Sequence, residues 1–271
     1  MIYLKSVSFS QVNQNHFPFS LPFFGNNYTF SSPVTLIVGE NGSGKSTFLE
    51  LLDEVLKLYK INSKNLEHQE LTKVLKEASS YVKCQFHLKK PKGFFFSAED
   101  FTSYIHYLIQ ERNASFEELK RIDKEYEHKS ELSKSLARMP HARTIGEIDS
   151  LYEKDLLKSS HGEAYLDFFK SRIRENEVYL IDEPETPLSI QNQLALLSII
   201  DEGVKRNNQF IIATHSPIMM AIPYAEIYQI DESGMHINHY DKIESIILLK
   251  QFMNHPESFF RHLYQPEEEK K

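Results

Sequence analysis

The chain has 271 residues, of which 41% are hydrophobic and 25% are charged, so it can bury the core of a globular protein. Its formal net charge of −7 excludes a global positive field that would draw it onto DNA or an anionic membrane. A single cysteine, Cys84, excludes a disulfide framework and a cysteine-based zinc site, and it favours a cytoplasmic location. The most apolar stretch, residues 210–230, is interrupted by His215, two prolines and Glu226, so we expect no membrane span.

Short strands and helices alternate through the first third of the chain. Residues 2–9 alternate between apolar and polar, which is typical of a strand. Residues 33–39 form an apolar run that leads into a glycine-rich loop, and apolar residues at helical spacing follow from Phe48 to Tyr59. We also expect a helix at 66–79 and strands at 80–88 and 93–97.

The middle of the chain, up to about residue 157, has a helical pattern and a high charge content. Its apolar stripe begins at Phe116 and loses its register at Lys129, which is too short for the sustained heptads of a coiled coil. The pattern therefore favours a helical subdomain over the root of a long coiled-coil arm.

Strands and helices alternate again in the last part of the chain. The expected elements are helices at 160–174 and 189–205, strands at 178–181, 209–213, 227–231 and 236–240, and a helical end. Strands that alternate with helices are typical of an α/β fold with a mostly parallel sheet.

The segment Gly39–Thr47 matches the pattern G-x-x-x-x-G-K-[ST] in full. It lies between a predicted strand and a predicted helix, as a phosphate-binding Walker A loop requires. Its glycines let backbone N–H groups turn toward phosphates, Lys45 would neutralise the β- and γ-phosphates, and Ser46 would hold Mg²⁺. The sequence therefore predicts a site for ATP with Mg²⁺. The candidate nucleotide-binding residues of this loop are Asn41, Gly42, Ser43, Gly44, Lys45, Ser46 and Thr47.

An apolar strand at 178–181 ends in two carboxylates, Asp182 and Glu183, as a Walker B motif does. Ligands of parallel sheets bind where the strands end, so these carboxylates are expected beside the Walker A loop. Asp182 would complete the Mg²⁺ shell. Glu183 would orient the attacking water as a general base.

Together these segments resemble the ATP-binding-cassette (ABC) ATPases. Residues 182–189 look like the D-loop region of that family, with Ser189 in place of the usual aspartate. Residues 211–217 look like its switch-histidine loop, in which His215 would bond the γ-phosphate and the attacking water. Residues 159–163, Ser-Ser-His-Gly-Glu, resemble the family signature in the form found in soluble SMC-like ATPases.

This resemblance implies an α/β P-loop NTPase fold of the ABC ATPase type, with a mostly parallel core sheet, an N-terminal antiparallel β part and a helical subdomain. It places the ATP-binding core in residues 1–97 and 160–271, with the helical subdomain inserted at 98–159. It also implies an ATP-dependent homodimer, because Ser160 and Gly162 of the signature would contact the ATP that the other copy holds.

The Q-loop glutamine, which in the family links the γ-phosphate to the helical subdomain, has no clear match. Glu99 or a neighbouring residue, at the junction before the helical part, is a candidate replacement, whereas Gln85 on the preceding strand is expected to be a spectator.

Three functions follow from the resemblance. The first is MgATP hydrolysis at a composite dimer interface, which drives a conformational cycle. The second is a slow ATP-dependent switch or clamp that acts on nucleic acid or an effector protein, as in DNA repair or phage defence. The third, the nucleotide-binding subunit of a transporter, is disfavoured by Ser189, by the form of the signature and by the missing Q-loop glutamine.

Overall fold

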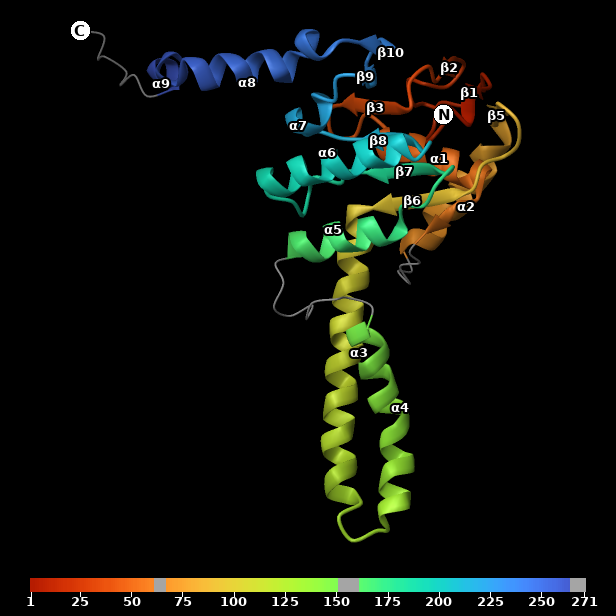
Figure 1. The fold of residues 1–271 in the computed structure, drawn as a ribbon. Coiled ribbons are helices and arrows are strands. Elements are labelled where there is room, and N and C mark those ends of the chain that lie inside the picture. The colour runs from red at the N-terminus through yellow and green to blue at the C-terminus, as the bar shows by residue number, and fades with distance from the viewer. Residues whose placement is uncertain (61–66, 151–160, 264–271) are drawn as a thin grey trace, which may run out of the picture.

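The computed structural model describes residues 1–60, 67–150 and 161–263, which form two β-sheets flanked by helices (Figure 1). The strands are β1 (Leu4–Phe9), β2 (Asn27–Thr29), β3 (Val34–Gly39), β4 (Tyr59–Lys60), β5 (Val82–Phe86), β6 (Gly93–Ser97), β7 (Val178–Asp182), β8 (Gln209–Ala213), β9 (Glu226–Asp231) and β10 (Gly234–Asn238). The helices are α1 (Lys45–Leu56), α2 (Glu67–Ala78), α3 (Ala98–Glu125), α4 (Glu131–Ser150), α5 (His161–Arg172), α6 (Ile190–Lys205), α7 (Pro217–Met220), α8 (Glu244–Asn254) and α9 (Pro256–Leu263).

The larger sheet has the strand order β10-β9-β3-β8-β7-β6-β4, and its neighbouring strands are parallel except for β10 beside β9. The smaller sheet, β2-β1-β5, is antiparallel and lies mostly in the N-terminal part of the chain. The predicted α/β fold, with a mostly parallel core sheet and an N-terminal antiparallel part, is confirmed. The short elements β2, β4 and α7 were not expected from the sequence.

Alternate residues of the parallel strands enter two separate hydrophobic cores. In β7, Tyr179 and Ile181 pack in the core beneath α5 and α6, whereas Val178 and Leu180 pack with α1 and the small sheet. All four side chains are buried, which explains why β7 is a continuous apolar run. Because both faces of the sheet are covered, a ligand can reach these strands only at their ends.

Strands β3, β8 and β7 are neighbours that run in the same direction, so their carboxyl ends meet at one edge of the sheet. Asp182 at the end of β7 pairs with Ala213 of β8 on one side and with Ser97 of β6 on the other. The loop after Gly39, the residues after Asp182 and the loop after Ala213 therefore lie side by side, as the sequence predicts for the Walker A, Walker B and histidine segments.

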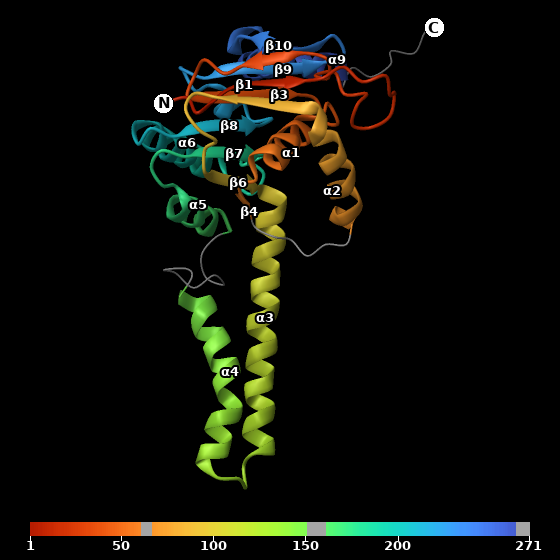
Figure 2. The ribbon, with the colours of Figure 1, turned by 90° about the vertical axis from the view of Figure 1, so that its right-hand side faces the viewer.

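Helices α3 and α4 form an elongated antiparallel hairpin that projects away from the sheets (Figures 1 and 2). The backbone N–H of Asp100 donates to Ser97 Oγ, so Ser97 caps the start of α3 directly after β6. Helix α3 ends at Glu125, and α4 begins at Glu131. Lys129 lies in the turn between the two helices, which explains why the apolar stripe loses its register there. The predicted helical part is thus an extended two-helix arm.

The base of this arm is anchored in the main core, whereas its outer half is not. Ile105 and Leu108 of α3 and Ile148 of α4 are buried in the core cluster that lies beneath α5 and α6. Farther out, Leu132 and Leu136 of α4 are 71% and 57% exposed. The arm starts at the predicted boundary, residue 98. The predicted end of the insertion at residue 159 lies outside the described residues, so the two-domain division stays a prediction.

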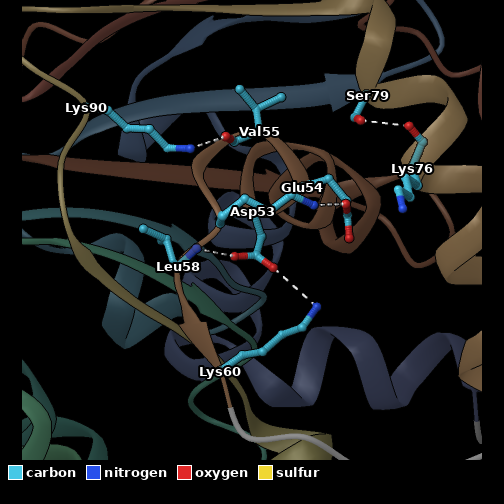
Figure 3. A network of polar contacts seen from close by, with 9 residues as sticks. Asp53, Glu54, Val55, Leu58, Lys60, Lys76, Ser79 and Lys90 are labelled. Atoms are coloured by element: carbon cyan, nitrogen blue, oxygen red, sulfur yellow. Dashed lines mark hydrogen bonds and ion pairs between the residues drawn. The ribbon is translucent and has the colours of Figure 1, made fainter.

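Asp53 closes the C-terminal end of α1 (Figure 3). Its carboxylate accepts a hydrogen bond of 3.2 Å from the Leu58 N–H and lies 3.3 Å from Lys60 Nζ. Burial raises the pKa of this carboxyl, and the Lys60 ammonium opposes the shift. Lys90 Nζ also donates to the Val55 carbonyl at 2.8 Å. These contacts fix the path from α1 into β4 and so hold the helix that follows the Walker A loop.

Helices α8 and α9 extend from the β10 side of the core, at the opposite end of the molecule from the arm (Figure 1). Within residues 1–60, 67–150 and 161–263, every helix is too short or too polar to cross a membrane.

Candidate active site

The Walker A loop joins β3 to α1, and its last glycine requires a backbone that other residues avoid. Gly44 has φ 100°, and a Cβ there would lie 2.9 Å from Leu21 Cδ2. Helix α1 begins at the next residue, and its N-terminus has no side-chain cap and no acidic residue in its first turn. The first N–H groups of α1 are therefore available to an anion, and the helix dipole favours negative charge there.

Lys45 lies within the loop and is only 4% exposed. Its Nζ donates to the carbonyls of Gly39 and Glu40 at 3.1 and 2.9 Å. Burial lowers the pKa of the Lys45 ammonium, and the nearby carboxylates of Glu183 and Asp182 oppose that shift. The loop thus holds one cation beside two carboxylates at the edge of the sheet.

Asp182 projects from the end of β7 toward the start of α1. Burial raises the pKa of its carboxyl to about 7; the Ser46 hydroxyl and the Lys45 ammonium oppose the shift, whereas Glu183 adds to it. A carboxyl with a raised pKa is stabilised in its charged form when a divalent cation lies beside it. A hydroxyl and a carboxylate are oxygen ligands of the kind that Mg²⁺ prefers, so Ser46 and Asp182 fit the predicted metal site.

Several buried polar atoms around the loop lack an internal partner. Ser43 Oγ and Asp182 Oδ1 have no hydrogen-bond partner among the described residues, and the one polar contact of His215 Nε2 among them is with Glu183 Oε1 at 3.2 Å. A buried polar atom without a partner is costly, and such groups are expected to meet a ligand, an ion or water. Their position around the exposed start of α1 fits a phosphate group with its metal ion.

Glu183 and His215 face each other across this edge. His215 Nε2 lies 3.2 Å from Glu183 Oε1, and the two side chains are 34% and 40% exposed. Glu183 has φ 46°, the left-handed region that a residue with a side chain rarely adopts, and its N–H donates to the Ala213 carbonyl at 2.9 Å. Such conformations gather at functional sites, where the surrounding structure holds them in place.

Glu185, which lies two residues after Glu183, was not predicted as a site residue from the sequence. Its Oε1 accepts hydrogen bonds from three groups of residues 214–216, the loop between β8 and α7 that we call the switch loop. The only signal in the sequence is a second carboxylate in Asp182-Glu-Pro-Glu, and nothing in that spacing indicates a contact about 30 residues downstream.

The predicted signature segment is described in part. Ser160 lies outside the described residues, whereas Gly162 is buried in the first turn of α5. A Cβ at Gly162 would lie 2.4 Å from Nδ2 of Asn192 on α6, so the glycine allows these two helices to approach closely. The structure does not bring Gly162 to the phosphate loop of its own chain through any described contact.

The structure separates the two Q-loop candidates. Gln85 lies in the small antiparallel sheet, where its Oε1 accepts a hydrogen bond from Ser6 Oγ at 3.1 Å. Glu99 is an exposed residue in the first turn of α3, two residues after Ser97, the strand partner of Asp182. Gln85 is therefore remote from the site, and Glu99 lies at its margin.

Comparison with protein families gives a match over residues 17–209 to a family described as "AAA domain". The chain belongs to this AAA domain family. Among curated proteins, this chain is 29% identical to a "Putative ABC transporter ATP-binding protein" of Methanosarcina acetivorans over 191 residues, covering 66% of this chain. The match covers 62% of the length of that relative. These findings confirm the resemblance to ATP-binding proteins of the ABC type.

The chain is also similar to two solved structures. The Smc head domain of Pyrococcus furiosus has a TM-score of 0.46 at 14% identity, over 93% of this chain and 100% of that chain. An ATP-binding cassette of an ABC transporter in its ADP conformation has a TM-score of 0.46 at 15% identity, over 98% of this chain and 100% of that chain.

Proposed function

We propose that this chain binds ATP with Mg²⁺ and hydrolyses it at a site completed by a second copy of the chain. The observation that supports this function best is the shared sheet edge, where the buried Lys45, the Asp182 and Glu183 carboxylates and His215 surround the open start of α1.

Binding rests on the Walker A loop. The N–H groups of residues 41–47 and the positive end of α1 would hold the phosphates. Lys45 would exchange its bonds to the Gly39 and Glu40 carbonyls for bonds to the β- and γ-phosphates. Ser46 and Asp182 would hold Mg²⁺, which when bound neutralises charge on the phosphates.

Glu183 is the proposed general base, because it is the exposed carboxylate next to the metal-binding position. It would accept a proton from the attacking water at Oε1 or Oε2. His215 would use Nε2, which lies 3.2 Å from Glu183 Oε1, to bond the γ-phosphate and orient that water.

The second copy would supply the signature. We propose that Ser160, together with Gly162 in the first turn of α5, contacts the γ-phosphate bound by the partner chain, so that two ATP molecules lie between two protomers. Closure and opening of this homodimer would then drive the conformational cycle. The single cysteine fits a cytoplasmic location for this cycle.

Turnover and binding of ATP test this function. We expect the purified protein to release phosphate from ATP only when Mg²⁺ is present. Lys45→Ala should abolish ATP binding, whereas Glu183→Gln should retain binding and lose at least about 100-fold in turnover, as is usual for loss of a general base. Glu117→Gln, on the exposed outer face of α3, is the matched control and should behave as wild type. Equal turnover in Glu183→Gln and wild type would contradict the proposal.

The projecting α3–α4 arm favours a second candidate, a slow ATP-dependent switch or clamp that acts on nucleic acid or an effector protein. The outer half of the arm leaves apolar side chains exposed, among them Leu132, Leu136 and Met139. A basal turnover near zero that rises on addition of DNA or of a partner protein would favour this candidate.

A further inference from the structure

One carboxylate organises the switch loop that presents His215. Glu185 Oε1 accepts hydrogen bonds from Thr214 Oγ1 at 2.7 Å, from the His215 N–H at 2.6 Å and from the Ser216 N–H at 3.0 Å. Bonds to an ionised acceptor are stronger than bonds between neutral groups. Three of them on one oxygen give this loop a single preferred position relative to the end of β7.

The contacts are shielded from solvent. Thr214 is fully buried and Ser216 is 5% exposed, whereas the His215 side chain between them is 34% exposed. The backbone of the loop is therefore held from within while the imidazole remains available at the surface of the site. This is the arrangement expected of a residue that acts on His215 through the backbone.

A second side chain ties the same loop to α6. Ser216 Oγ donates to Gln193 Oε1 at 2.6 Å, and Gln193 Nε2 donates to the Leu188 carbonyl at 3.2 Å. Residues 183–189, which follow the Walker B strand, are thus joined to the switch loop at Glu185 and again at Leu188. The position of Glu183 and the position of His215 are set by the same short segment.

We propose that Glu185 is a positioning residue for ATP hydrolysis: by accepting the three hydrogen bonds from residues 214–216, its carboxylate holds the His215 imidazole against Glu183. This proposal rests on the proposed function, because His215 needs a fixed position only if it orients the γ-phosphate and water. Glu185 acts on the loop through Oε1, whereas its buried Oε2 has no hydrogen-bond partner among the described residues.

The alternative is that Glu185 only stabilises the fold. A double-mutant cycle separates the two roles, because a residue that acts through His215 has nothing left to position once the imidazole is gone. We expect Glu185→Ala to lower kcat about 100-fold with the KM for ATP changed less than about threefold. We expect Glu185→Ala/His215→Ala to be no slower than His215→Ala.

Glu226→Ala is the matched control. Glu226 also uses its carboxylate to hold a loop, accepting from the Ser31 N–H at 3.1 Å and from Ser31 Oγ at 2.7 Å, but it lies away from the site. Its kcat should equal that of wild type. Should Glu185→Ala fail to fold, Glu185→Gln replaces it, since the amide keeps an acceptor oxygen without the charge; about a tenfold loss of kcat is then expected.

Hydrogen exchange tests the position of the switch loop independently of ATP hydrolysis. Hydrogen exchange of the His215 and Ser216 amides should accelerate at least about tenfold in Glu185→Ala, or in Glu185→Gln, and should be unchanged in Glu226→Ala. Unchanged exchange would overturn the positioning role. So would a double variant whose kcat lies below that of His215→Ala by the same factor by which Glu185→Ala lies below wild type. A wild-type protein that hydrolyses no ATP would instead overturn the proposed function, while accelerated exchange would still show that Glu185 holds the loop.

Discussion

Glu183 occupies a backbone conformation that its own side chain disfavours. At φ 46° the Cβ of an ordinary residue crowds the following carbonyl, which costs about 1 kcal/mol, whereas glycine has no such cost. The N–H of Glu183 bonds to the Ala213 carbonyl, so the sheet edge holds the residue there. The proposed general base is thus retained at a position where glycine would be more stable.

We therefore expect Glu183→Gly to unfold at higher urea concentration than Glu183→Gln, with a difference of about 1 kcal/mol in the free energy of unfolding. Both changes remove the same charge, so the difference between their free energies of unfolding reports the cost of the backbone conformation at this position. Both variants should lack turnover. Equal stability of the two, measured without nucleotide, would show that the backbone at this position is not strained.

Glu50 on α1 makes the stability of the fold depend on pH. Burial raises the pKa of its carboxyl to about 7 from an ordinary value of 4.5; the charge of Asp182 adds to the shift and Lys60 opposes it. Because the folded pKa is raised, the protonated form stabilises the fold fully below about pH 4.5, and this contribution is lost as pH rises to about 7.

Glu50→Gln should therefore be more stable than wild type at pH 8, by at most roughly 3 kcal/mol, and nearly equal to it at pH 4.5. Urea unfolding of the nucleotide-free proteins at the two pH values measures this difference. Glu117→Gln, which changes an exposed glutamate on α3, should show no such dependence on pH. A Glu50→Gln variant that is less stable than wild type at pH 8 would contradict the account.

Local patterns were enough to predict the positions of Lys45, Asp182, Glu183 and His215 at one sheet edge, because each follows or ends a strand that could be recognised from its apolar run. Their catalytic roles stay predictions. Glu185 could not be predicted, because its importance comes from hydrogen bonds to a loop about 30 residues away. Glu50 could not be predicted either, since burial of a helical glutamate depends on what packs over it.

At the scale of elements, long periodic segments were predicted well and short ones were not. Helices α1 and α6 and strands β3, β7 and β8 have apolar patterns that directly reflect burial in the two cores. Strand β4 has two residues and β2 has three, too few for any period to appear. These strands exist because they pair with β6 and β1, and such pairing is a property of the tertiary fold.

The shape of the α3–α4 arm could also not be predicted from the sequence pattern alone. Its helical character was predicted, but its shape as an extended hairpin was not. The apolar stripe loses its register at Lys129, and this break was the signal in the sequence. In the structure Lys129 lies in the turn that follows the end of α3 at Glu125. A loss of register does not by itself distinguish a turn between two helices from a poorly packed subdomain.

At the scale of the whole molecule, one chain provides the phosphate loop, the two Walker B carboxylates and His215, whereas the start of α5 makes no described contact with that loop. Gly162 packs against Asn192 of α6 instead. The proposed site is therefore incomplete in a single copy and requires a second copy of the chain.

The most direct test is the mass of Glu183→Gln in solution, measured by size-exclusion chromatography with light scattering, with and without MgATP. We expect a mass of one 31.7 kDa chain without nucleotide and of two chains with MgATP, because binding continues while hydrolysis is blocked. Lys45→Ala/Glu183→Gln should remain a monomer in both conditions. A Glu183→Gln protein that binds ATP and yet remains a monomer would contradict the shared site.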